Sequence, residues 1–100
     1  MICTLTARRL TPGAYDEFRA AWDPGATAGE ALKGWKRIYH ARDVADPDVV
    51  LSFGLFDGSL DELRAAQSAM GRNAQVGRVD PLVAEVLLDG SYEIVEELTP

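Results

Sequence analysis

The sequence predicts an α+β fold whose elements follow the order strand, helix, strand, strand, helix, strand. Two segments rich in β-branched and aromatic residues, Trp35–Arg42 and Val49–Phe56, flank a connector dense in Asp and Pro, which is typical of a β-hairpin. An aromatic stripe at helical spacing precedes this hairpin, and a helix-capping motif at Ser59 follows it. The two remaining strands are expected at the ends of the chain.

Length and composition limit the class of protein. The 100 residues predict one domain that spans residues 1–100, and the net charge of −6 makes nucleic acid and anionic membranes unfavourable partners. No apolar run approaches the ~20 residues of a membrane span. Residues 1–9 place their basic side chains after the apolar ones, opposite to a signal peptide. We therefore expect a cytoplasmic protein without a membrane partner.

The first strand and the first helix are predicted from residues 1–22. Residues 1–9 mix apolar and threonine side chains, which suits a strand covered on both faces, and the lone Cys3 is expected to be a small buried hydrophobe there. Thr11 and Pro12 predict a helix start, as N-cap and first helical residue. The stripe that should face the sheet consists of Tyr15, Phe18 and Trp22.

The middle of the chain predicts a loop and then two strands of different character. Residues 24–34 are rich in Gly and Ala and form either a plain connector or a flap; their glycine spacing matches no phosphate-binding motif. Trp35–Arg42 has no purely apolar face, so it is expected at the sheet edge. Val49–Phe56 is apolar on both faces and is expected in the interior, where Gly54 leaves a gap for a ligand or a side chain.

The second helix and the last strand are predicted from residues 59–98. Ser59 and Glu62 form a capping box, and Gly71 is a plausible stop for that helix. Residues 72–88 are predicted to be a helical excursion, because Asp80-Pro81 suits the start of a short helix and residues 82–88 are apolar except for Glu85. A turn at Asp89-Gly90 then leads to a final strand over residues 92–98, whose side chains alternate.

This order is the ferredoxin-like β-α-β-β-α-β arrangement, with the antiparallel sheet order 4-1-3-2. Two helices cover only one face of such a sheet, whereas Val49–Phe56 is apolar on both faces. An identical sheet from a second chain would cover the other face, so we expect a homodimer. The basic edge (Lys33, Lys36, Arg37, Arg42) and the acidic edge (Glu93, Glu96, Glu97) either meet across the two-fold axis or are merely solvated.

Four segments carry a resemblance to a known family: Thr11-Pro12-Gly13, Gly34-Trp35, Phe53-Gly54-Leu55-Phe56-Asp57 and Asp89-Gly90-Ser91-Tyr92-Glu93-Ile94. Over nearly its whole length the chain resembles the dimeric α/β barrel superfamily, particularly the small proteins similar to antibiotic biosynthesis monooxygenases (ABM-like proteins). The resemblance implies a barrel of two sheets with a pocket between sheet and helices in each subunit. Some relatives oxidise polyketide-like aromatics without a cofactor, some degrade haem, and many have no assigned activity.

The residues present narrow these implied functions. Haem-degrading relatives use an Asn, Trp and His constellation with the Asn on the first strand, where this chain has Thr4 and Thr6; its only Asn is Asn73. The sequence also contains no metal-ligand cluster, no GxSxG and no CxxC. We therefore expect no metal and no cofactor.

The candidate site residues are aromatic or lie on the first strand of the predicted hairpin. The candidates for substrate binding are Tyr15, Phe18, Trp22 and Trp35, and those for catalysis are Arg37, Tyr39 and His40. Arg37 or His40 would stabilise an enolate that Tyr39 orients. Strand alternation places Trp35, Arg37 and Tyr39 on one face and His40 on the other, which argues against one shared cavity. The alternative is that the aromatic residues of the first helix fill the core, and that His40 is exposed or at an interface.

Two hypotheses about function follow. In the first, a dimeric α/β-barrel protein binds a small apolar or aromatic molecule and acts as a cofactor-independent monooxygenase. In the second, the chain is a non-catalytic dimeric module, structural or ligand-binding, whose aromatic residues belong to the core. A filled interface between helices and sheet would favour the second hypothesis, because it leaves no room for a substrate.

Overall fold

The computed structural model describes residues 1–22 and 32–100, so most of the predicted loop or flap at residues 24–34 lies outside the described residues. The elements are β1 (Ile2–Leu10), α1 (Tyr15–Ala21), β2 (Trp35–Arg42), β3 (Val49–Phe56), α3 (Leu60–Ala69), α4 (Arg72–Val79), the 3-10 helix η1 (Asp80–Leu82) and β4 (Val83–Glu93). In this part of the chain every helix falls short of the length and apolar character that crossing a membrane requires.

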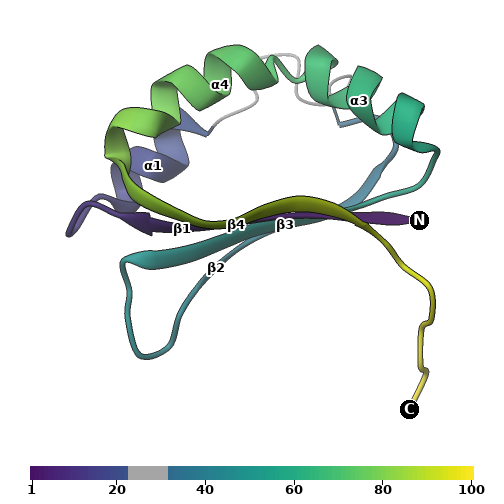
Figure 1. The fold of residues 1–100 in the computed structure, drawn as a ribbon, viewed down its shortest axis with the longest axis horizontal. Helices are drawn as coiled ribbons and strands as arrows, with labels where there is room; N and C mark the ends of the chain where they lie inside the picture. The colour runs from purple at the N-terminus through teal and green to yellow at the C-terminus, as the bar shows by residue number, and fades with distance from the viewer. Residues whose placement is uncertain (23–31) are drawn as a thin grey trace.

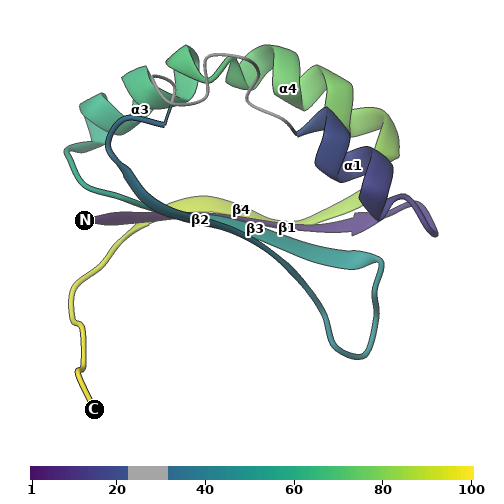
Figure 2. The ribbon, with the colours of Figure 1, turned by 180° about the vertical axis from the view of Figure 1, so that it is seen from behind.

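The four strands form one antiparallel sheet in the order β2-β3-β1-β4, which confirms the predicted topology and the interior position of β3. All the α-helices labelled in Figure 1 lie on one side of this sheet, and the view from behind in Figure 2 shows the same layering. We call the side that faces the helices the covered face and the other side the open face. On β3 the covered face carries Val50, Ser52, Gly54 and Phe56, which are all buried.

The register extends these two faces to β1. Thr4 pairs with Gly54 and Thr6 with Ser52, so the threonines of β1 lie on the covered face. Cys3 pairs with Leu55 and therefore lies on the open face. Its side chain is only partly buried, so the expectation of a buried cysteine on a strand covered on both faces is wrong for the single chain.

The core lies between the covered face and α1, at one end of the sheet. Phe18 and Val50 have no exposed surface, and Leu10 and Val79 are exposed by 2% or less. Their contacts join β1, α1, β3 and α4 in one cluster. Burial of four such side chains stabilises the fold by roughly 1.5–3 kcal/mol each.

The first helix begins later than the sequence predicted. The Ala14 N–H donates to the Thr11 carbonyl at 3.1 Å, and Gly13 has a φ of 76°. Residues 11–14 therefore form a turn with Pro12 in its second position and Gly13 in its third, where a type II turn requires a positive φ. The predicted N-cap at Thr11 is wrong, because Pro and Gly together favour this turn over a first helical turn.

The second helix agrees with its prediction at both ends. The Glu62 N–H donates to the Ser59 hydroxyl at 3.2 Å, and the Ser59 N–H donates to the Glu62 carboxylate at 3.1 Å, which completes the capping box. The Ser59 N–H and, to a smaller extent, the Ser59 hydroxyl favour the charged form of the Glu62 carboxylate, which holds the pKa of Glu62 below its usual value. Gly71, with a φ of 69°, separates α3 from α4.

The position of the last strand differs most from the sequence-based prediction. β4 runs over Val83–Glu93 instead of residues 92–98, and Asp89-Gly90 lies inside the strand instead of forming a turn. The helical excursion is confirmed for Arg72–Val79 and for the short 3-10 helix Asp80–Leu82, and it is wrong for residues 83–88. Two register shifts between β1 and β4 interrupt the alternation of β4, which hid its strand period. Residues 94–100 leave the sheet on the side away from the helices (Figure 1).

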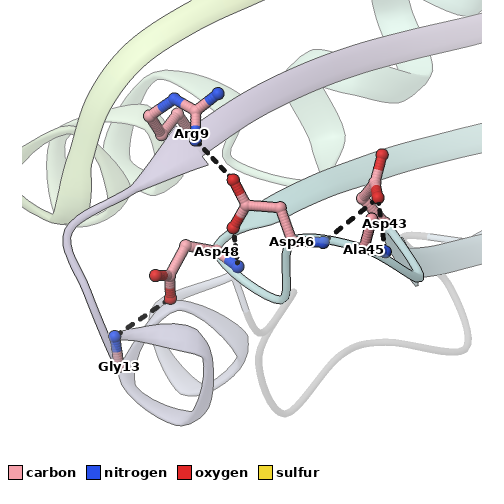
Figure 3. A network of polar contacts seen from close by, with 6 residues as sticks. All are labelled: Arg9, Gly13, Asp43, Ala45, Asp46 and Asp48. Atoms are coloured by element: carbon pink, nitrogen blue, oxygen red, sulfur yellow. Dashed lines mark hydrogen bonds and ion pairs between the residues drawn. The ribbon is translucent and has the colours of Figure 1, made fainter.

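The connector of the β2–β3 hairpin is held by its aspartates (Figure 3). The Asp43 carboxylate accepts two backbone N–H groups of the connector, at 2.7 and 3.2 Å. Asp46 pairs with Arg9 of β1 at 2.7 Å, and Asp48 accepts the Gly13 N–H at 3.0 Å. The connector is thereby tied to β1 and to the turn before α1.

Candidate functional site

A cavity of about 320 Å³ lies between the covered face and the helices. Small-molecule sites in proteins typically measure roughly 300–1,000 Å³, so this volume suits a small ligand. Its floor includes Thr4, Thr6, Arg8, Ser52, Gly54, Asp89 and Ser91 from the strands. Its roof and walls include Trp22, Trp35, Ile38, Arg64, Gln67, Met70, Arg72, Gln75 and Val76.

The cavity exists because the middle of the covered face carries short side chains. Thr4, Thr6, Ser52 and Gly54 are neighbours on β1 and β3, whereas bulky Val50 and Phe56 lie at the two ends of the same face of β3. Above these residues, α3 and α4 form an arch over the sheet (Figure 1). The residues that line the cavity from this side are Arg64, Gln67 and Met70 at α3, and Arg72, Gln75 and Val76 of α4.

A β-bulge turns Trp35 into this cavity. The register of β2 against β3 shifts between Trp35 and Arg37, so Trp35 lies on the covered face opposite Phe56. The two rings meet edge to face with centroids 5.2 Å apart. A Cβ at Gly54 would lie 2.7 Å from the Trp35 ring, so the predicted gap at this glycine is occupied by the indole.

The bulge also separates residues that strand alternation had grouped together. Arg37 pairs with Leu55 and Tyr39 with Phe53, so both lie on the open face, away from the cavity. The Tyr39 ring stacks on the Phe53 ring with centroids 5.0 Å apart. The prediction that Trp35 shares a face with Arg37 and Tyr39 is therefore wrong, because counting in twos cannot detect an inserted residue.

His40 lies on the covered face, in contrast to the expectation of an exposed or interfacial side chain. Its ring meets those of Trp22 and Phe18 edge to face, with centroids 4.5 and 5.6 Å away. Its Nδ1 is 2.8 Å from the hydroxyl of Ser52, which lines the cavity. Burial, together with the smaller effects of the nearby charges of Arg19 and Arg8, lowers the pKa of His40 to about 4. The imidazole is therefore neutral at pH 7.

The aromatic candidates for substrate binding divide into two groups. Trp22 and Trp35 line the cavity. Phe18 is fully buried in the core, and Tyr15 packs against that core with its ring 6.2 Å from that of Phe18. The cavity thus brings together two of the four predicted binding residues, and His40 supports it through Ser52 and Trp22.

Three arginines of the cavity were missed by the sequence analysis. Arg8 of β1 has a guanidinium nitrogen, Nη1, that is buried and has no hydrogen-bond partner. Arg72 lies 3.9 Å from the Asp89 carboxylate, and Arg64 donates to Gln67 at 2.9 Å and to the Ser91 hydroxyl at 3.4 Å. Alternation from Thr4 and Thr6 would have placed Arg8 on their face, but no local signal marks the two helical arginines.

The sheet order and the helices on one face define a ferredoxin-like α+β domain. Solved structures with this fold include a "putative antibiotic biosynthesis monooxygenase" from Chloroflexus aurantiacus, with a TM-score of 0.73 and 23% identity over 98% of this chain and 96% of that chain. A protein of the same description from Caulobacter crescentus has a TM-score of 0.78 and 19% identity over 95% of this chain and 90% of that one.

A third solved structure is an uncharacterised NIPSNAP domain protein from Burkholderia xenovorans, with a TM-score of 0.67 and 14% identity over 100% of this chain and 99% of that chain. No family model matches the sequence, and no curated protein is significantly similar to it. The resemblance to ABM-like proteins is therefore confirmed at the level of the fold, over nearly the whole chain.

Proposed function

We propose that this chain binds a small aromatic molecule in the cavity between its sheet and its helices. The observation that carries this proposal is a cavity of about 320 Å³ lined by two tryptophans. Trp22, Trp35 and Ile38 supply apolar walls, and the polar floor of Thr4 and Ser52 supplies groups that orient a ligand.

We further propose that the chain acts as a homodimer in which two open faces meet. The open face of β3 consists of Val49, Leu51, Phe53 and Leu55, all partly exposed. Tyr39, Leu88 and Tyr92 continue this apolar surface on the neighbouring strands and are exposed by 44–48%. Monomeric proteins rarely expose an apolar patch of this continuity, and a second copy would remove it from water.

The reaction that we propose is cofactor-independent oxygenation of the bound aromatic molecule, which the likeness to proteins described as monooxygenases supports. Such a substrate forms a stabilised carbanion and reduces O₂ itself. A ring methylene and O₂ then give a carbonyl and water, so the substrate supplies all the electrons and both hydrogens of the water. The protein needs to bind the substrate, stabilise its enolate and exclude bulk water.

A non-catalytic ligand-binding dimer is the alternative, and two observations favour it. Arg37 and Tyr39, two of the three catalytic candidates, lie on the face opposite the cavity. The third, His40, has a pKa of about 4, which makes its neutral imidazole a weak base. Under this alternative the cavity binds its ligand unchanged.

Oxygen uptake separates the two functions. Hydroquinone- and anthrone-type aromatics are incubated with the protein aerobically and anaerobically, while an electrode follows O₂ and tryptophan fluorescence follows binding. An oxygenase consumes O₂ in step with substrate, and Trp35→Leu lowers the rate at least tenfold because the ring that lines the cavity is lost. Tyr39→Phe, on the open face, serves as the matched control and keeps the rate.

The outcomes of this experiment are distinct. Saturable quenching of tryptophan fluorescence without O₂ uptake would overturn the oxygenase and support the ligand-binding dimer. Neither quenching nor uptake with any aromatic would overturn the proposal that the cavity is a ligand site.

A further inference from the structure

The charge of the cavity contrasts with the charge of the chain. The chain has a net charge of −6. Among the described residues that line the cavity, however, Arg8, Arg64 and Arg72 are cationic and only Asp89 is anionic. The chain is acidic as a whole, but the described residues that line the cavity between its helices and its sheet carry a net positive charge. Such a local field concentrates anionic ligands against the field of the whole molecule.

The sheet order separates the aromatic and the cationic residues of this cavity. Trp35 and Ile38 belong to β2, at one edge of the sheet, and Trp22 reaches the same edge through its contact with His40. The arginines gather at the opposite side: Arg64 bonds Ser91 of β4, and Arg72 pairs with Asp89 of β4. Arg8 lies on β1, next to β4. The cavity therefore has an apolar aromatic wall and a cationic wall.

Arg8 has no anionic partner among the described residues. Its guanidinium lies over the Phe18 ring, 5.5 Å from the centroid, but it forms no ion pair, and its Nη1 is buried without a hydrogen-bond acceptor. Burial lowers the pKa of its guanidinium, although the charges of Asp89 and Asp80 act in the other direction. Asp89 is itself engaged by Thr6 at 3.2 Å and by Arg72 at 3.9 Å. An unpaired, partly desolvated cation costs stability unless a ligand supplies the missing acceptor.

We propose that the ligand of this cavity is an aromatic carboxylate, whose ring lies at the wall of Trp22 and Trp35 and whose carboxylate binds at the wall of Arg8 and Arg72. This inference rests on the proposed function and adds the chemical class of the ligand. A planar carboxylate matches the fork of a guanidinium, which binds both oxygens at once. A neutral aromatic molecule of the same shape would leave Arg8 desolvated and unpaired.

A pair of probes of nearly equal shape tests the inference: 2-naphthoate and its neutral amide, 2-naphthamide. Titration calorimetry on the full chain, at low and at 0.5 M salt, gives the dissociation constant of each. We expect naphthoate to bind at least tenfold more tightly than naphthamide at low salt. Arg8→Gln and Arg72→Gln each weaken the binding of naphthoate and thereby remove most of this preference.

Arg78→Gln is the matched control, because it removes the same charge from the same helix as Arg72→Gln but from a residue that does not line the cavity. It should retain the preference for the carboxylate. Circular dichroism and thermal unfolding of all variants exclude loss of the fold as a cause.

The outcomes distinguish this inference from the proposed function. Equal affinity for the two probes, or a carboxylate preference that survives in both Arg8→Gln and Arg72→Gln, overturns the inference and leaves the aromatic site standing. An equal loss of preference in Arg78→Gln also overturns it, because the preference then comes from overall charge. Absence of binding by both probes overturns the proposed ligand site and this inference with it.

Discussion

The two faces of β3 differ in polarity, and the face that the helices cover is not the more apolar one. The side chains under the helices are Val50, Ser52, Gly54 and Phe56, whereas those on the open face are Val49, Leu51, Phe53 and Leu55. The face that the helices protect is thus the less apolar one, and β1 repeats the contrast with Thr4 and Thr6 against Leu5. A polar floor beneath a roof indicates a ligand site, and an apolar face without cover indicates a protein partner.

The largest effect is expected from a charge on the open face. Leu51→Asp would place an unpaired carboxylate between two sheets, at a cost of about 3–5 kcal/mol. At ~1.4 kcal/mol per tenfold, this raises the dissociation constant of the dimer at least ~100-fold. Analytical ultracentrifugation at micromolar concentration should therefore show a dimer for the native chain and a monomer for the variant.

Leu60→Asp is the control for this experiment, because Leu60 is exposed by 51% in the first turn of α3, away from the open face. It should remain dimeric. A native chain that sediments as a monomer would contradict the comparison of the two faces, since the apolar face would then stay in water.

Smaller effects are expected from alanine substitutions of two glycines, Gly54 on the covered face and Gly77 on α4. Gly54→Ala brings a Cβ to 2.7 Å from the Trp35 ring, so overpacking should lower the free energy of unfolding by about 1–3 kcal/mol. Gly77→Ala on α4 meets no atom within 4 Å and should raise it by about 0.5–1 kcal/mol, because alanine favours the helix. Urea denaturation measures both, and equal effects would mean that Trp35 does not pack on Gly54.

The third prediction concerns pH. The pKa of His40 is about 4 in the folded chain, against an ordinary value of 6.5 for histidine, so the unfolded chain binds the proton more readily. The free energy of unfolding should therefore fall as the pH drops from about 6.5 to about 4, by about 1–2 kcal/mol once the partial exposure of the ring is allowed for. His40→Gln cannot titrate and should lack this component.

Urea denaturation of both proteins between pH 4 and pH 7.5 measures this difference, and the proton resonances of the only histidine report its pKa directly. The carboxylates titrate in both proteins and cancel in the comparison. A midpoint near 6.5 in the folded protein would show that His40 is solvated instead of packed between Trp22 and Phe18.

The smallest effects are expected from two adjacent arginines that point to opposite faces. Arg8→Met removes a partly desolvated charge from the covered face and should leave the free energy of unfolding unchanged or raise it by about 1 kcal/mol. Arg9→Met breaks the exposed pair with Asp46 at 2.7 Å and should lower it slightly, in a manner that salt abolishes. Urea denaturation at low and high salt tests both; a clear loss for Arg8→Met would assign Arg8 a structural role.

Much of this fold follows from local sequence signals. The hairpin from Trp35 to Phe56 and the Ser59 capping box depend on turn residues, strand composition and neighbouring side chains, and both are confirmed. The sheet order follows from the element order together with the handedness of crossovers. β4 was misplaced because its register shifts break the alternation that identifies a strand, and because its apolar run suits a buried helix equally well.

The site was less predictable, because tertiary pairing decides which residues meet. The choice of Trp22 and Trp35 rested on aromatic character, and both line the cavity. The positions of Arg37 and Tyr39 depended on a register that one inserted residue shifts. Arg64 and Arg72 reach the cavity only through the arch of α3 and α4, which no pattern along the chain reveals.

The bulge between Trp35 and Arg37 decides which side of the sheet the indole occupies. In plain alternation of the same residues, Trp35 would share the side of Arg37 and Tyr39, which faces the partner and not the ligand. Deletion of Lys36 would remove the extra residue and leave the indole opposite Phe56, because Trp35 and Arg37 already pair with consecutive residues of β3. The aromatic wall of the cavity thus depends on one residue that the strand accommodates without pairing.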